Sequence, residues 1–325
     1  MKLSEVGEFG LIAKLRKIVS AGPGVLLGIG DDCAVVRIGN RRLLLTTDTL
    51  VEGVHFRRGW DTAEGLGRKA FAVNASDIAA MGGMPRFALL SVAAPGSASM
   101  RELEQFHRGF SRAARAWGCS LVGGNLSRAG VWMITVMLVG EPCGKPLTRA
   151  GAHTGDAIYV SGVLGAAGFG RELLLRKRGS RPVAHATAAF RRPTPRLAVG
   201  QTLARRRLAT AAIDVSDGLL QDLGHLCRAS EAGAVVEANL LPLAPALLRL
   251  PRARALSLAL AGGEDYELLF TVSPATERRL IAAAGIVHPI RRIGRIVRGR
   301  GVKVVDAGGR ALSLANAGFD HFSRR

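Results

Sequence analysis

The stretch TTDTLVEGVHF, residues 46–56, sets an aspartate among hydroxyl residues at the end of a β-rich run. Three other motifs give aspartates similar surroundings: GIGDD at residues 28–32, NASD at 74–77 and DVSD at 214–217. Acidic residues are scarce in this chain, since 25 of them face 45 basic ones. Aspartates with hydroxyl and carbonyl neighbours supply the hard oxygen ligands that Mg²⁺ prefers. The pattern therefore indicates a site for cations and phosphate groups.

The composition predicts a folded protein with two domains of ordinary size. The chain has 325 residues, 48% hydrophobic and 22% charged, which suffices for buried cores. No apolar run approaches the roughly 20 residues that a membrane-spanning helix requires. The amino-terminal segment contains Glu5 and Glu8 and lacks the apolar core of a signal peptide. We expect a cytoplasmic protein without a membrane partner, and the four widely spaced cysteines predict reduced thiols.

A net charge of +20 raises the question of nucleic-acid binding. The basic residues are mostly arginine, 38 against 7 lysines, and they are scattered along the chain. Aromatic residues for base stacking are few, with 3 Trp and 2 Tyr. We therefore predict no nucleic-acid partner, and a basic surface that attracts anionic substrates.

Residue patterns predict mixed α and β structure in two domains, 1–145 and 146–325, separated at the turn-rich EPCGKP of residues 141–146. In the first domain we expect helices at 8–19, 62–81 and 99–117 and strands at 25–38, 43–51, 87–95, 121–124 and 131–140. In the second domain we expect a strand from Ala157, a glycine-rich turn at 162–170 and then a helix, a strand and helix around DVSDGLL, and a strand in GGEDYELLFTV. P-loop and dinucleotide-binding motifs are absent from the sequence.

Each acidic motif, taken singly, has a structural alternative. Asp217 or Ser216 could cap a helix, because side-chain oxygens at a helix start accept from free backbone N–H groups. Asp77 shares a helix face with Asn74 and lies among apolar residues, where an unpaired carboxylate is costly. The adjacent Asp31 and Asp32 repel one another unless a counter-ion holds them or the turn is solvated.

Together the motifs resemble the thiamine-monophosphate kinase family, within the aminoimidazole-ribonucleotide-synthetase-like superfamily. The resemblance runs nearly end to end, through GEF (7–9), GIGDDCAVV, TTDTLVEGVHF, NASDIAAMGGMP, LVGGN, LTRAGAHTGDAIYVSG, DVSDGL, GGEDYELLF and GFDHF (318–322). It implies an α+β fold of two domains, whose first domain dimerises across its strands to give a homodimer. It also implies ATP-dependent phosphorylation of thiamine monophosphate to thiamine diphosphate, by direct in-line transfer with several Mg²⁺ ions and no catalytic base.

The resemblance also assigns site residues. The metal ligands it implies are Asp31, Thr46, Thr47, Asp48, Asp77, Asn125, Asp214 and Asp217. The nucleotide-contacting residues it implies are His107, Gly124, Asn125, Arg149 and Ser216. The thiamine-phosphate residues it implies are His55, Glu264 and Phe319. Three positions depart from the family pattern: Asn125 replaces the usual Asp, His107 a common Tyr, and Phe319 a Trp or Tyr.

Other functions remain open on the sequence. Another ATP-dependent synthetase or kinase of the same superfamily would use the same motifs. A second alternative is a catalytically impaired regulator that binds Mg-nucleotide, and Asn125 is the sequence feature that favours it. A nucleic-acid binder is the third alternative. Product analysis, ATP turnover and salt-dependent nucleic-acid affinity distinguish these functions.

Overall fold

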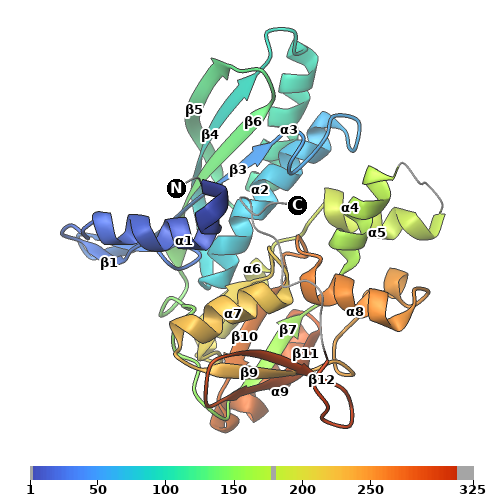
Figure 1. Ribbon diagram of the computed structural model, residues 1–325. Coiled ribbons are helices and arrows are strands. Elements are labelled where there is room, and N and C mark those ends of the chain that lie inside the picture. The colour runs from blue at the N-terminus through green and yellow to red at the C-terminus, as the bar shows by residue number, and fades with distance from the viewer. Residues whose placement is uncertain (1–2, 177–180, 313–325) are drawn as a thin grey trace.

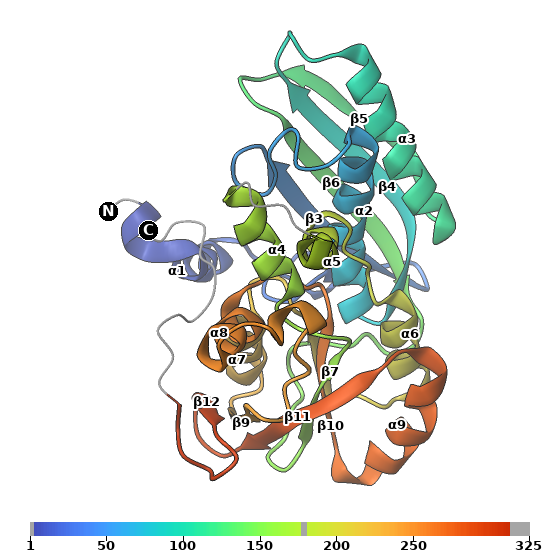
Figure 2. The same ribbon diagram turned by 90° about the vertical axis from the view of Figure 1, so that its right-hand side faces the viewer.

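The computed structural model describes residues 3–176 and 181–312, and the first half of the chain forms one six-stranded sheet with helices on one face (Figures 1 and 2). Its elements are α1 (Leu3–Ile18), β1 (Val25–Leu27), β2 (Ala34–Ile38), β3 (Arg41–Val51), α2 (Ala63–Ala80), β4 (Gly83–Ala94), α3 (Met100–Ala116), β5 (Ser120–Arg128) and β6 (Met133–Pro142). The strand order is β1-β2-β3-β6-β4-β5, with β4 and β5 parallel and the other pairs antiparallel.

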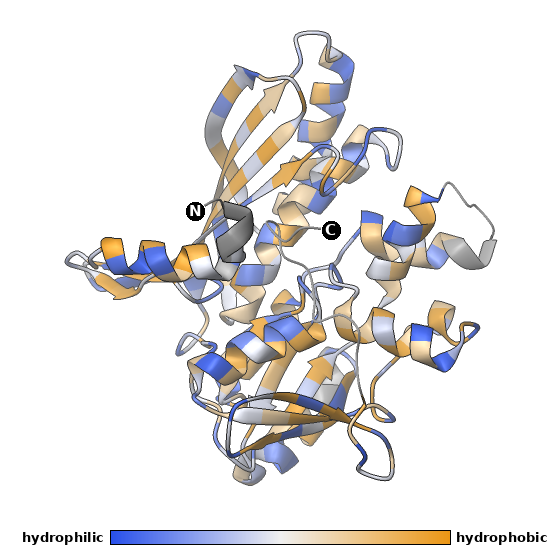
Figure 3. Ribbon diagram, in the orientation of Figure 1, coloured by the Kyte–Doolittle hydropathy of each residue, from blue (hydrophilic) through white to orange (hydrophobic). Residues whose placement is uncertain are grey.

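The alternation of side chains in β4 and β6 decides which face of this sheet is covered. Ala88, Leu90 and Val92 of β4 are buried, as are Ile134, Val136 and Leu138 of β6. Because successive side chains of a strand point to opposite faces, these residues form one apolar face, which packs on α2 and α3. Figure 3 shows the corresponding alternation of colour along these strands. The opposite face keeps Phe87 and Leu89 exposed, and we call it the open face.

Helix α2 lies at the centre of the molecule. Thr62 caps its start, because the Thr62 hydroxyl accepts from the Gly65 N–H at 3.0 Å. Most of its side chains are buried, and it packs on β3, β4, β6, α3 and also α6. The predicted helix over 62–81 is thus confirmed to within a residue at each end, and so are those at 8–19 and 99–117 as α1 and α3, α1 with an earlier start.

The second half forms a separate six-stranded sheet. Its elements are β7 (Ala157–Ser161), α4 (Ala166–Leu175), α5 (Arg181–Arg191), α6 (Leu197–Arg206), β8 (Ala211–Asp214), α7 (Leu219–Ala229), β9 (Gly233–Glu237), a 3₁₀ turn (Pro245–Leu247), α8 (Arg252–Ala261), β10 (Leu268–Val272), α9 (Pro274–Val287), β11 (Ile290–Val297) and β12 (Gly301–Val305). The strand order is β12-β9-β11-β7-β10-β8. The α+β class expected from the sequence is confirmed.

The glycine-rich turn predicted at 162–170 is wrong in extent, because α4 already begins at Ala166. Gly168 and Gly170 therefore lie inside this helix. A Cβ at Gly168 would overlap the backbone of Gly262, and one at Gly170 would overlap the carbonyl of Ala186. These glycines serve close packing of α4 rather than a turn. Among the described residues, no helix has both the length and the apolarity to span a bilayer.

Candidate active site

A cleft of about 1540 Å³ lies between the two halves, and both line it. One wall comes from α1, the loop at residues 28–32, β3 and α2; the other comes from Arg149, α7 and the loops before α7 and before β10. Figure 1 shows α2 running from the first sheet down to the second half. The cleft gathers most of the residues that the family resemblance implies: Asp31, Thr46, Thr47, Asp48, His55, Asp77, Arg149, Asp214, Ser216, Asp217 and Glu264.

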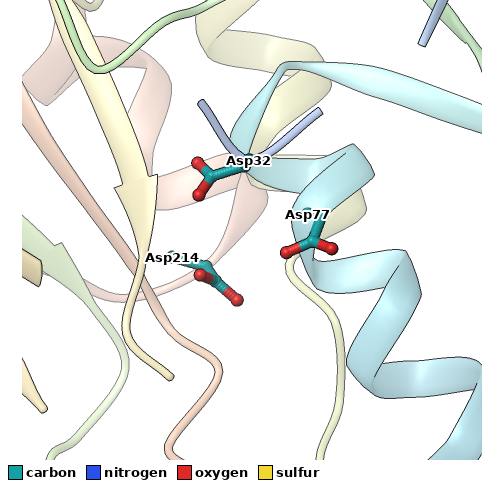
Figure 4. A group of neighbouring side chains, drawn as sticks. All are labelled: Asp32, Asp77 and Asp214. Carbon is teal, nitrogen blue, oxygen red and sulfur yellow. The ribbon is translucent and has the colours of Figure 1, made fainter. Parts of the chain in front are cut away.

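Three carboxylates form the acidic centre of the cleft. Asp32 comes from the loop before β2, Asp77 from α2 and Asp214 from the end of β8. One oxygen atom of each lies within 4.8 Å of the others, and Figure 4 shows the three groups facing a common space. This spacing and the all-oxygen donor set suit a hard divalent cation such as Mg²⁺.

Neighbouring polar groups hold two of these carboxylates in place. The Thr46 hydroxyl donates to Asp77 Oδ2 at 2.5 Å, and the Ser76 hydroxyl donates to Asp214 Oδ2 at 2.6 Å. The Asp48 N–H donates to Asn74 Oδ1 at 2.9 Å. Asn74 and Asp77 thus both face β3, which confirms that they share one side of the helix.

Arg149 connects both aspartates of the GIGDD loop to the second half. Its backbone N–H donates to the Asp31 carboxylate at 3.1 Å. Its guanidinium donates to Asp32 Oδ1, from Nη2 at 2.5 Å and from Nε at 3.2 Å. The Asp32 side chain is only 1% exposed, and its other oxygen, Oδ2, is buried without a hydrogen-bond partner. A lone buried carboxylate oxygen is costly, so it marks where a cation fits.

Burial perturbs the ionisation of the cluster. Burial, and next the Asp32 charge, raises the pKa of Asp31 to about 7 and that of Asp214 to about 8. Burial and then the Asp48 charge raise the pKa of Asp77 well above its usual value. The cleft thus concentrates negative charge at a cost that a bound cation would offset.

We expect the metal-free protein to lose stability as the pH rises from about 6.5 to about 8. Since the folded pKa values of Asp31 and Asp214 lie above the ordinary 3.8, the folded state binds more protons than the unfolded state in this range. The unfolding free energy then falls by at most about 1.4 kcal/mol per pH unit for each titrating group. His225, whose pKa burial lowers to about 3, is neutral in both states over most of this window.

Thermal unfolding in the presence of a chelator, at several pH values in this window, measures the effect. Excess Mg²⁺ should flatten the decline. A melting temperature that rises with pH in the chelated protein would show that these carboxylates are ionised without cost.

The DVSDG loop settles the alternative for Asp217. Helix α7 begins after Gly218, and Asp222 in its first turn accepts from the N–H groups of Asp217 and Gly218 at 3.2 and 3.1 Å. The Asp217 carboxylate accepts from Gln221 Nε2 at 3.1 Å and lines the cleft. The N-cap position of α7 is thus Gly218, not Asp217 or Ser216, and Asp222 accepts from the N–H group of that N-cap residue.

The structure describes two of the three residues that the resemblance assigns to thiamine phosphate. The His55 ring accepts from the Val51 N–H through Nδ1 at 3.0 Å, which fixes its orientation at the cleft. Glu264 lies on the far wall in the GGED loop. Phe319 lies outside the described residues.

Three of the site residues that the resemblance implies, His107, Gly124 and Asn125, do not line the cleft of their own chain. His107 on α3 contacts the Leu103 carbonyl, and Gly124 and Asn125 lie on the edge strand β5. Asn125 pairs in register with Ser91 on the open face, while a Cβ at Gly124 would overlap the Leu90 carbonyl, so packing alone requires glycine there. Thr47 lines the cleft, but its hydroxyl donates to the Val136 carbonyl at 3.0 Å.

The site residues predicted from the sequence omit two buried side chains. Asp32 lines the cleft but is not among the ligands that the resemblance implies. Lys69 on α2 does not line the cleft, but its Nζ lies 2.5 Å from Glu264 Oε2, which does. A lysine within the apolar run of α2 is the one signal that pointed to a buried ion pair.

Comparisons with known proteins match both halves of the chain. The family model described as AIR synthase related protein, N-terminal domain, matches residues 30–141, and its C-terminal-domain counterpart matches 153–307. The thiamine-monophosphate kinase of Escherichia coli (strain K12) is 39% identical over 324 residues, which is 98% of each chain. The solved structure of AaThiL complexed with AMPPCP and TMP has a TM-score of 0.87 and 36% identity, covering 99% of both chains. The E. coli hydrogenase maturation protein HypE, with a TM-score of 0.70 and 22% identity over 95% of this chain and 98% of that one, shares the fold.

Proposed function

The chain belongs to the thiamine-monophosphate kinase family, and from that premise we propose that it transfers the γ-phosphoryl group of ATP to thiamine monophosphate. The observation that carries this proposal is the acidic cluster of the cleft, formed by the family motifs themselves. The acceptor is a phosphate monoester oxygen, which is already anionic near neutral pH, so the reaction requires no strong base. What the reaction requires is that the charged phosphate groups be held and screened, and a cleft with carboxylates and an arginine at its centre suits that requirement.

We further propose that several Mg²⁺ ions work in this cleft and that transfer is direct and in line. Two polyanions must meet, and each pair of unit charges 4 Å apart repels by about 4 kcal/mol at an effective dielectric constant of about 20. Bound Mg²⁺ would supply the charge that screens donor from acceptor. Asp31, Asp48, Asp77, Asp214 and Asp217 would hold it, with the hydroxyl oxygen of Thr46 beside them. Asp32 would join this set, since one of its oxygens lies within 4.8 Å of those of Asp77 and Asp214 and its Oδ2 is buried without a hydrogen-bond partner.

Arg149 and Ser216 would contact the nucleotide phosphates, while His55 and Glu264 would contact thiamine monophosphate at the same cleft. The guanidinium of Arg149 is already oriented by Asp32, so it offers its remaining N–H groups without losing side-chain freedom on binding. We keep Phe319 as a further thiamine contact on the family resemblance alone.

We expect the protein to be a homodimer, with the open face buried between two copies. Phe87 and Leu89 on β4 and Met133 on β6 are 51%, 42% and 40% exposed on this face, and Leu26 of β1 and Ile38 of β2 are exposed as well. Large exposed apolar side chains gathered on one face of a sheet are typical of an interface. Sedimentation at micromolar concentration should give the mass of two chains, and Phe87→Asp with Leu89→Asp should shift it toward one. A wild-type mass of a single chain would contradict the dimer.

We propose that burial of the open face in a dimer brings Asn125 near a second copy of the cleft, where it holds Mg²⁺ and nucleotide. Gly124 and His107 are kept as nucleotide contacts on the family resemblance alone. Asn125 offers a neutral oxygen where the family usually has a carboxylate, so binding of one ion is weakened while chemistry persists. Asn125→Asp should therefore lower the Mg²⁺ concentration needed for half-maximal rate. An unchanged or higher requirement in an Mg²⁺ titration would remove Asn125 from the ligand set.

Incubation of purified protein with ATP, Mg²⁺ and thiamine monophosphate, followed by product identification, tests the function directly. Thiamine diphosphate and ADP are the expected products. If the folded protein forms no thiamine diphosphate, the kinase proposal is wrong. If it forms ADP with another phosphate acceptor only, a related synthetase or kinase activity replaces it.

A further inference from the structure

Lys69 is a buried cation in α2 that the proposed chemistry does not use. Its side chain is 3% exposed, and its Nζ lies 2.5 Å from Glu264 Oε2. The same Nζ lies 3.6 Å from the centre of the Phe190 ring in α5. An ammonium group is kept at such depth only where opposite charge and an aromatic face replace its water. The ion pair therefore joins α2 to a loop 195 residues later in the chain.

The loop that carries Glu264 has a backbone fixed on several sides. Glu264 adopts a left-handed conformation with φ 59°, and its N–H donates to the Ser216 carbonyl at 2.7 Å. The next carboxylate, Asp265, accepts from the N–H groups of Gly165 and Ala167 at 2.7 and 3.2 Å, at the start of α4. The backbone thus places Glu264 beside the DVSDG loop, and what remains to be fixed is its side chain, which is 20% exposed to the cleft.

Helix α2 contacts the second half through two side chains that project from the same face of the helix. Ser76 lies seven residues after Lys69, so the two side chains project from the same face about 10 Å apart along the axis. Ser76 donates to Asp214 of the acidic cluster at 2.6 Å, while Lys69 pairs with Glu264. One rigid helix therefore sets the separation between the metal end of the cleft and Glu264.

We propose that Lys69 is a positioning residue for thiamine monophosphate, whose ammonium holds the Glu264 carboxylate at the end of the cleft that receives the heterocyclic part of the substrate. This inference rests on the proposed function, since the family resemblance assigns Glu264 to the thiamine-phosphate site. The alternative is that the pair only fastens the two halves together. If Lys69 positions Glu264, its loss weakens the affinity for thiamine monophosphate. If the pair only joins the two halves, its loss lowers stability and leaves that affinity unchanged.

Lys69→Met tests the proposal, because methionine keeps an apolar contact with Phe190 and removes only the charge. We expect KM for thiamine monophosphate to rise about 10- to 100-fold, as for the loss of a charge-assisted hydrogen bond. KM for ATP and the Mg²⁺ requirement should stay within about twofold of wild type, because the acidic cluster is held independently by Ser76 and Thr46.

A double-mutant cycle separates positioning from fastening. If Lys69 acts through Glu264, adding Lys69→Met to Glu264→Gln should raise KM for thiamine monophosphate no further than Glu264→Gln alone. Arg196→Met is the matched control: Arg196 forms a comparable buried pair with Glu267, at 2.5 Å, and does not line the cleft. It should lower the melting temperature and leave both KM values unchanged.

Two milder variants keep the test valid if Lys69→Met does not fold. Phe190→Leu removes the aromatic face and Lys69→Arg changes the shape of the cation, and each should raise KM for thiamine monophosphate selectively by about threefold or more. Unchanged KM in folded Lys69→Met, or in both milder variants, overturns the role of Lys69 while wild-type activity stands. Absence of thiamine diphosphate from folded wild type overturns the proposed function instead.

Discussion

Asp77→Asn is expected to lower kcat about 10²- to 10³-fold while the protein stays folded, because in the proposed site the lost charge helps to hold cations between donor and acceptor phosphates. Asparagine keeps an oxygen that can accept from the Thr46 hydroxyl, so local geometry survives. The substitution also removes a carboxylate that Asp48, Asp214 and Asp32 repel. We therefore expect the metal-free variant to be as stable as wild type or more stable.

Single-turnover rates and thermal unfolding, both with and without Mg²⁺, measure these effects. Asp156→Asn provides the control, because Asp156 is also buried but accepts from His153 and Thr210 and does not line the cleft. That variant should lose stability and keep its kcat. Near-wild-type turnover in Asp77→Asn, and likewise in Asp48→Asn, would exclude these carboxylates from the metal site.

The elements that build the cleft could be predicted where their signals are local. The start of α2 follows from Thr62, and the shared face of Asn74 and Asp77 follows from helical spacing. The aspartate motifs lie within or directly beside regular elements, so their backbones are fixed within a few residues. Local chemistry was enough to indicate a site for cations and phosphates.

What the sequence could not decide depends on residues far apart in the chain. Asp32 rather than Asp31 joins the closest group of carboxylates because Arg149, 117 positions later, draws its side chain inward. The partner of Lys69 is likewise set by tertiary packing. Gly124 shows that a motif residue can have a purely structural reason. The resemblance implies that it contacts nucleotide, but glycine is required there in any case, because a Cβ would overlap the Leu90 carbonyl.

Arg149→Met is expected to lower the free energy of unfolding by about 3–5 kcal/mol near pH 7.5 in the absence of Mg²⁺, because it leaves Asp32 buried without its counter-charge. The Asp32 side chain is 1% exposed and receives both of its guanidinium hydrogen bonds from Arg149. The loss should shrink toward about pH 5.5, since a carboxyl whose folded pKa is raised takes up a proton and sheds its charge there. Denaturant unfolding at the two pH values measures it.

The double variant Asp32→Asn with Arg149→Met separates stability from function. Removing the buried charge as well should restore most of the lost stability, because an amide is far cheaper to bury than an ion. Activity should remain low, since the guanidinium proposed to contact the nucleotide phosphates and one carboxylate charge of the acidic cluster are both gone. If the double variant recovered activity along with stability, Arg149 would serve only to neutralise Asp32, and the nucleotide contact proposed for it would be wrong.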